Sequence, residues 1–149
     1  MSLLREIGAE LPGVEQLRRM AEEDRQPGMA TTFGMRIVEV GEGRVTLTAT
    51  PGPHVENTNA VAQGGFAAAL LDMACGYAVI SKLPVGRTCS TLELKIAYHR
   101  PVRLDAGVMR AEGVVVHMGS RIAYSEARFL DEAGKLYASA SSTLMLGDI

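Results

Sequence analysis

Hydrophobic residues change their spacing several times along the chain, and each spacing predicts a different element. Residues 11–23 place apolar side chains at helical intervals between glutamates and arginines, which predicts a short amphipathic helix. From Thr31 the period becomes two, and two alternating segments flank the glycine-rich turn at 41–43. This pattern predicts a β-hairpin over residues 31–50, with one face more polar than the other.

Residues 63–82, QGGFAAALLDMACGYAVISK, form a much longer apolar segment, which we expect to be a helix. Asp72 carries the only charged side chain between Glu56 and Lys82. A helix that is apolar on every side has to be enclosed by other elements. A lone carboxylate inside it is costly to bury, so Asp72 either has hydrogen-bonding partners or takes part in chemistry.

Four further alternating segments follow this helix, at about 88–99, 107–117, 121–130 and 135–146. Two strands, one enclosed helix and four more strands predict an α+β domain in which a single, mainly antiparallel sheet wraps the helix. The uncovered face and edges of such a sheet predict a homo-oligomer. Strand parity places Thr91 off the face that is formed by Leu92, Leu94 and Ile96.

Composition narrows the classes of function. The chain has 149 residues, of which 47% are hydrophobic and 21% are charged, values typical of one globular domain. The net charge is −2 with both signs interspersed, which argues against nucleic acid or an anionic membrane as the main partner. A bilayer span over residues 64–81 would bury Asp72, so we do not expect one.

Cysteine and histidine positions give no sign of a disulfide framework or a metal site. Cys75 and Cys89 each lie in an apolar or strand-like segment, which favours reduced thiols and a cytoplasmic location. The first residues lack a basic region followed by a long apolar run, so we expect no signal peptide. No closely spaced cluster of His and Cys suggests zinc. We therefore expect a cytoplasmic protein that uses neither a metal nor an added cofactor.

Polar and small residues precede and enter the long helix, and a strand of mixed character follows it. Their spacing is His54-x2-Asn57-x5-Gln63-Gly64-Gly65-x6-Asp72. The later segment, residues 91–101, has the sequence TLELKIAYHRP. Together these motifs resemble the hotdog-fold acyl-CoA thioesterases, and the phenylacetate-degradation (PaaI) type is the most similar group.

The resemblance covers roughly residues 31–146 and implies a hotdog domain at 31–149 after an N-terminal helical segment at 1–30. In this fold a long central helix is wrapped by a curved sheet of about six strands. The sequence departs from the family pattern at two positions: Gln63 stands where the family usually has His, and Ala60 where it often has Gly. A glutamine side chain cannot titrate, which leaves Gln63 a backbone or binding role instead of proton transfer.

The resemblance implies hydrolysis of acyl-CoA thioesters, with coenzyme A as part of the substrate. On the matching positions, Asp72 would act as base or nucleophile, Asn57 would position substrate or water, and the Gly64 N–H would bind the oxyanion. Thr91 matches a position near the carboxylate where the family often has Ser or Thr, which implies a catalytic role. The family also forms homodimers, which are commonly paired into tetramers.

The expected helix start gives this activity a physical basis. Gly64 and Gly65 open the helix, so their N–H groups lack intrahelical acceptors and lie at the positive end of the helix dipole. One such donor typically stabilises an oxyanion by about 3–4 kcal/mol. Asp72 lies roughly 12 Å further along the axis at about 1.5 Å per residue. One carbonyl cannot reach both groups, so we expect a two-fold dimer in which Gly64 of one helix faces Asp72 of the other.

Coenzyme A carries phosphate groups, so cationic side chains are expected near its binding site. The candidates are Arg100, Arg103 and Arg121, and a surface ion pair is the alternative role for each. We expect Arg100 and Arg121 to bind the substrate, together with Gln63 and Gly65.

Other interpretations stay open. Asp72 could be a structural residue bonded to a Ser, a Tyr or a backbone N–H, and Asn57 could serve only a turn. A hotdog hydratase or dehydratase would need a His beside the acidic residue, yet no His lies between His54 and His99. A non-catalytic acyl-CoA-binding module would not need Asp72. The sequence also leaves open the acyl group and whether Asp72 attacks carbon or activates water.

Overall fold

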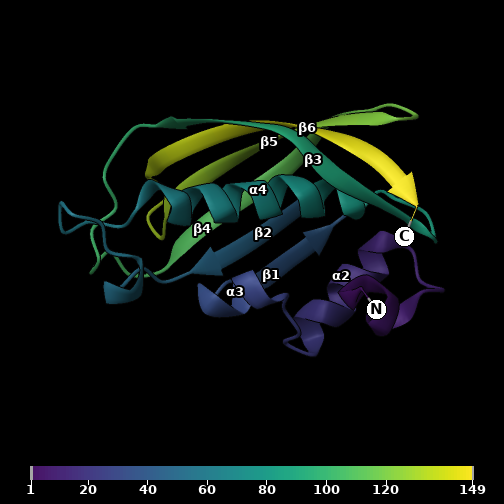
Figure 1. Cartoon of the computed structure of the whole chain (residues 1–149), viewed down its shortest axis with the longest axis horizontal. Coiled ribbons are helices and arrows are strands. Elements are labelled where there is room, and N and C mark those ends of the chain that lie inside the picture. The colour runs from purple at the N-terminus through teal and green to yellow at the C-terminus, as the bar shows by residue number, and fades with distance from the viewer. Residues whose placement is uncertain (1, 149) are drawn as a thin grey trace.

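One antiparallel sheet organises the computed structural model, which describes residues 2–148 (Figure 1). The spatial order of its strands is β1-β2-β4-β5-β6-β3. The strands are β1 (Arg36–Gly41), β2 (Arg44–Ala49), β3 (Arg87–Tyr98), β4 (Met109–Met118), β5 (Ile122–Asp131) and β6 (Leu136–Asp148). Strand β3 follows the long helix but pairs with β6, so β1 and β3 form the two edges of the sheet.

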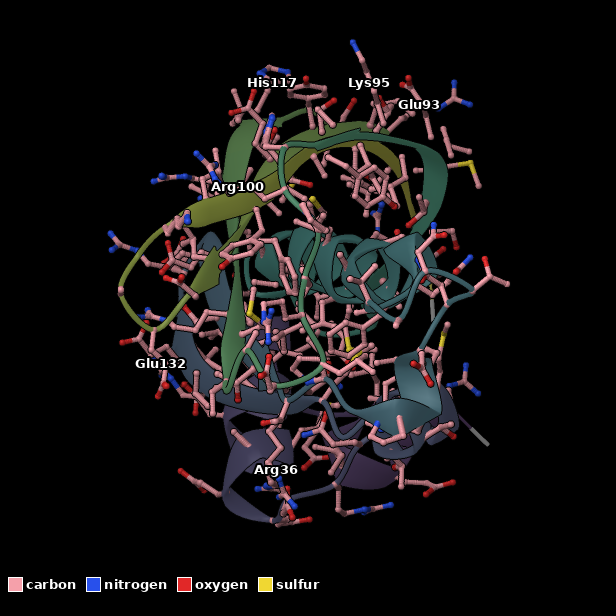
Figure 2. The ribbon with its side chains drawn as sticks, turned by 90° about the vertical axis from the view of Figure 1, so that its left-hand side faces the viewer. Arg36, Glu93, Lys95, Arg100, His117 and Glu132 are labelled. Carbon is pink, nitrogen blue, oxygen red and sulfur yellow. The ribbon has the colours of Figure 1, made fainter. Side chains whose placement is uncertain are left out.

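The long helix α4 (Gly64–Ile80) lies in the concave face of the sheet, and Figure 2 shows it end-on with the strands curving around it. Its sheet-facing side chains, including Phe66, Leu70 and Leu71, are buried. The backbones approach closely at Gly113 of β4, where the Cβ atom of any other residue would lie only 2.2 Å from the Ala74 carbonyl oxygen. The expectation of one long helix wrapped by a single, mainly antiparallel sheet is therefore confirmed, and the sheet covers the helix on one side.

Short helices cover the lower edge of the sheet near β1 (Figure 1). They are α1 (Leu3–Gly8), α2 (Gly13–Glu22) and α3 (Gly28–Thr32), and a single 3-10 turn, η1 (Pro53–Val55), lies in the loop before α4. Only α2 was expected from the sequence. Because Leu17 and Met20 of α2 belong to the same core cluster as α4, the N-terminal segment packs on the six-stranded sheet. A domain boundary at residue 30 stays a prediction.

The first strand begins later than the alternating pattern indicated. The expectation of a strand from Thr31 is wrong, because α3 continues to Thr32 and β1 begins only at Arg36. Gly34 lies between them with φ of 65°, a conformation that suits glycine and turns the chain into the sheet. The alternation of Phe33, Met35 and Ile37 thus reflects a helix end and a turn as well as a strand.

Strand β3 contains a bulge that changes which residues share a face. Thr91 pairs with Leu144, and the next paired residue is Glu93, so Leu92 is the extra residue and is 56% exposed. The bulge brings Thr91 onto the face of Leu94, toward α4. The expectation that Thr91 lies off this face is therefore wrong, because strict two-residue alternation holds only where pairing is uninterrupted.

Candidate active site

The start of α4 presents two backbone donors. Gln63 is the residue before the helix, and its carbonyl accepts a hydrogen bond from the Phe66 N–H at 2.9 Å. Within residues 2–148 the N–H groups of Gly64 and Gly65 have no acceptor, and the Gln63 side chain does not cap them. The Gln63 N–H donates to the Val55 carbonyl at 2.7 Å, which fixes the approach of the loop. These free donors lie at the positive end of the helix dipole, as the sequence predicted.

Asn57 shapes the loop that leads to this helix start. Its side-chain Oδ1 accepts the N–H groups of Asn59 at 2.8 Å and Val61 at 3.3 Å. Its own backbone N–H donates to the Val61 carbonyl at 2.8 Å. The turn role that the sequence left open is thus real. Because the loop uses Oδ1, the side-chain amide NH₂ is the group of Asn57 that remains to meet a ligand.

A cleft of about 330 Å³ lies beside the helix start. Its polar wall combines Asn57, Gln63 and Gly64 with Tyr98 at the end of β3 and Arg100 just after it. The Tyr98 hydroxyl donates a hydrogen bond to the Gly64 carbonyl at 2.8 Å. Arg100, labelled in Figure 2, donates from Nη1 to the Leu136 carbonyl at 2.6 Å, which holds its guanidinium beside this first cleft.

A second cleft, of about 480 Å³, runs along the exposed side of α4 and contains Asp72. The Thr91 hydroxyl donates to Asp72 Oδ1 at 2.9 Å, and Gly65 also lines this cleft. Within residues 2–148, Asp72 Oδ2 makes no hydrogen bond. Most of the remaining wall is apolar and is formed by Pro27, Met29, Ala68, Ala69, Met73, Gly76, Tyr77, Ile80, Cys89, Leu94 and Leu144. The half-buried carboxylate therefore has one positioned partner and one free oxygen in an apolar setting.

The two cysteines are poor nucleophiles in this environment. Burial raises the pKa of the Cys75 thiol to about 11. Burial, and then the nearby charge of Asp72, raise the pKa of Cys89 to about 12, and its thiol donates to the Gly76 carbonyl at 3.6 Å. Both side chains stay protonated near neutral pH, so neither supplies a thiolate, and Asp72 is the carboxylate that lines the second cleft.

The three candidate arginines for phosphate binding have different surroundings in the structure. Arg103 forms a two-pronged ion pair with Asp105 at 2.8 and 2.9 Å, which raises the pKa of Arg103 and lowers that of Asp105. Arg121 lies in the turn between β4 and β5 and lines neither cleft. His99 lines the first cleft, with Nε2 3.0 Å from Ser139 Oγ. Arg100 is the arginine that borders a cleft along α4.

Sequence reasoning missed several residues that line the two clefts. Pro27 and Met29 come from the N-terminal segment and reach the Asp72 cleft only through the tertiary fold. Tyr98 belongs to the segment that carries the family resemblance, but its contact with Gly64 has no sequence signal. Among residues 2–148, no three His, Cys, Asp or Glu side chains gather as metal ligands would. In the same part of the chain, no helix combines the length and apolar character needed to cross a bilayer.

A family model and a curated protein match this chain. The model described as "Thioesterase superfamily" matches residues 59–138, more than half of the sequence. The Halobacterium salinarum protein named "Putative esterase VNG_1336C" is 32% identical over 106 residues, which cover 66% of this chain and 67% of that protein.

Two solved structures share the fold. A phenylacetic acid degradation-related protein from Ralstonia eutropha is 27% identical and has a TM-score of 0.78, over 87% of this chain and 98% of the other. The E. coli PaaI protein of the phenylacetic acid degradation operon is 22% identical and has a TM-score of 0.79, over 92% of this chain and 94% of the other. These matches confirm the hotdog fold and the PaaI-like resemblance. The chain belongs to the thioesterase superfamily, has the hotdog fold and is similar to the PaaI-like group of that superfamily.

Proposed function

We propose that the protein hydrolyses acyl-CoA thioesters, and that Asp72 and the Gly64 N–H carry the reaction. The observation that supports this most directly is the division of one helix into two chemical parts. Its start offers free N–H donors, and its middle offers a carboxylate that is held by Thr91 in an apolar cleft. Hydrolysis needs both parts, because the carbonyl oxygen gains charge while an oxygen nucleophile attacks the carbonyl carbon.

The roles follow from the hydrogen bonds. The Gly64 N–H receives the developing oxyanion at the positive end of the helix dipole. The Thr91 hydroxyl occupies Asp72 Oδ1 and leaves Oδ2 for the reaction. Oδ2 either removes a proton from a water that attacks the carbon, or attacks the carbon itself to give a mixed anhydride that water then cleaves. In both routes the C–S bond breaks, and the products are the free acid and the CoA thiol.

We further propose that each site is shared between two subunits. Gly64 lines the first cleft and Asp72 the second, and Asp72 lies eight positions after Gly64, roughly 12 Å along the helix axis. A homodimer with antiparallel α4 helices would bring Gly64 of one chain to Asp72 of the other. The long edge strand β3 supports such an assembly, since within residues 2–148 it pairs only with β6 and exposes Leu92.

Coenzyme A would enter through the first cleft. Arg100 supplies a fixed positive charge for a phosphate group, and Gln63 and Asn57 supply amide groups for polar contacts. The apolar second cleft would hold the acyl group. A substrate-binding role for Arg121 stays a prediction, and Arg121 lines neither cleft. No cofactor is needed for this reaction. Because Cys75 and Cys89 are free thiols, we propose that the protein works in a reducing compartment, the cytoplasm.

The decisive experiment measures release of free CoA thiol over a panel of short, long and aromatic acyl-CoAs, with p-nitrophenyl esters as a comparison series. We expect turnover of at least one acyl-CoA, which Asp72→Asn lowers by at least ~10²-fold. Turnover of oxygen esters alone would replace this function with a general esterase. Tight acyl-CoA binding without turnover would instead identify a binding module.

Sedimentation tests the assembly separately. We expect a dimer or a dimer of dimers at micromolar concentration. A stable monomer that hydrolyses acyl-CoA would overturn the shared site while leaving the activity in place.

A further inference from the structure

Tyr98 is the last residue of β3, and its ring covers the first residue of α4. The side chain lines the first cleft and is 54% exposed. Its hydroxyl donates to the Gly64 carbonyl oxygen at 2.8 Å. A Cβ atom at Gly64 would lie 3.3 Å from both Cζ and the hydroxyl oxygen of Tyr98, so the ring rests directly on the glycine. The edge strand and the helix start are therefore joined by this hydrogen bond.

This contact acts on one particular peptide group. The carbonyl of Gly64 and the N–H of Gly65 belong to the same planar, resonance-stabilised unit. A hydrogen bond to the oxygen of an amide withdraws electron density and strengthens its N–H as a donor, by roughly 10–30% per bond in condensed-phase estimates. The Gly65 N–H has no acceptor within residues 2–148, so this gain is available to a ligand.

The same contact restrains the direction in which the Gly65 N–H points. Glycines at the first two helical positions leave the backbone with unusual freedom, because neither residue has a Cβ atom. The side chain of Gln63 makes no capping hydrogen bond to restrain them. Tyr98 is thus the side chain that ties this turn to the sheet.

From these contacts we infer that Tyr98 is a positioning residue for the oxyanion site: it orients the Gly64–Gly65 peptide and makes the Gly65 N–H a second, polarised donor beside the Gly64 N–H. The expected effect of Tyr98 on turnover rests on the proposed function. The expected effect of Tyr98 on the Gly64–Gly65 peptide does not. Tyr98 need not touch the substrate. Because the side chain is more than half exposed, its hydrogen bond contributes little to folding, and its loss should affect turnover more than stability.

The test is Tyr98→Phe, which keeps the ring and removes only the hydroxyl. Tyr124→Phe is the matched control, since Tyr124 lines a depression with Lys95 and Glu126 on the other face of the sheet. With the acyl-CoA that the wild type turns over fastest, we expect Tyr98→Phe to lower kcat about 5- to 10-fold, the scale of one hydrogen bond, with KM changed less than 2-fold. The thermal midpoint and the control variant should match the wild type.

A second measurement does not depend on turnover. In ¹H–¹⁵N spectra of the intact oligomer, Tyr98→Phe should move the Gly65 amide resonance upfield, while Tyr124→Phe leaves it in place. An unchanged kcat, or a lower kcat with an unmoved Gly65 resonance, would overturn the inference. If the wild type hydrolyses no thioester, the proposed function is wrong, and the Gly65 resonance alone then decides whether Tyr98 polarises this peptide.

Discussion

The start and the middle of α4 offer different chemical groups on one helix. At the start, the useful groups are backbone N–H donors of Gly64 and Gly65, bordered by polar side chains of two loops and the end of β3. In the middle, the useful group is one carboxylate, held by Thr91 and surrounded by apolar residues. The first region depends on the absence of side chains and the second on one particular side chain. Substitutions should therefore affect the two regions in distinguishable ways.

The largest expected effect is at the middle of the helix. Asp72→Asn removes the anionic oxygen while keeping the shape of the side chain, so the fold and KM should persist. We expect kcat to fall by at least ~10²-fold, the scale of a positioned acid–base group. Thiol release measures this, with Glu126→Gln on the outer sheet face as a control that keeps its activity. Near-normal turnover of Asp72→Asn would make Asp72 a structural residue.

Mixing two inactive variants tests whether the two regions meet across subunits. Asp72→Asn damages the middle of the helix, and Gly64→Val damages its start. If each site takes one region from each chain, a mixed dimer has one intact site, and random exchange should restore about a quarter of wild-type activity. Native mass spectrometry confirms the exchange. Full exchange without recovery would show that both regions act within one subunit.

A smaller effect is expected from the contact that holds the carboxylate. Thr91→Val removes the 2.9 Å hydrogen bond to Asp72 Oδ1 and keeps the volume of the side chain. One hydrogen bond to a charged group is worth about 1.5–3 kcal/mol, so kcat should fall roughly 10- to 100-fold. Thr91→Ser, which retains the hydroxyl, should keep most of the activity. Equal losses in both variants would contradict an orienting role for the hydroxyl.

The smallest effect on activity is expected from a substitution in the first cleft. Arg100→Ala should raise KM for acyl-CoA about 3- to 10-fold and leave kcat nearly unchanged, because a phosphate contact far from the reacting carbon binds substrate and transition state alike. Acyl-pantetheine, which lacks the phosphates that Arg100 would bind, is the matched substrate and should show no change. A similar rise in KM with both substrates would mean that Arg100 maintains the shape of the first cleft instead of binding phosphate.

The reactivity of the two thiols tests the apolar setting of the middle of α4. Because burial raises the pKa of Cys75 to about 11 and that of Cys89 to about 12, both thiols should stay protonated at pH 8. A thiol reagent should therefore modify the native protein slowly at pH 8, and the rate should rise continuously as the pH approaches these pKa values. Fast labelling of Cys89 at pH 8, followed by mass spectrometry, would contradict this picture of the Asp72 cleft.

Much of the architecture was accessible from local sequence. An apolar segment of helical length with one carboxylate predicts an enclosed helix, and period-two segments on either side predict the sheet around it. The motif from Asn57 to Asp72 led to the correct superfamily because its spacing is tied to the start of that helix. These features are local, so backbone geometry and burial determine them directly.

Other features depended on contacts between distant segments. The bulge at Leu92 reversed the face of Thr91, and it arises from the register of β3 with β6, which no single segment records. The position of Tyr98 over Gly64 joins residues 34 apart in the chain. Arg121 was an equal candidate to Arg100 in the sequence, yet the two lie in different turns of the fold.

The sequence by itself determined that α4 exists, that it opens with two glycines and that it carries a single acid, since these depend on residue type and spacing. Only the tertiary structure decided that Thr91 holds Asp72, that Met29 lines its cleft and that Gly64 and Asp72 face different clefts. The physical reason is that secondary structure follows from local periodicity, whereas side-chain contacts depend on strand register and on the packing of segments that are far apart in sequence.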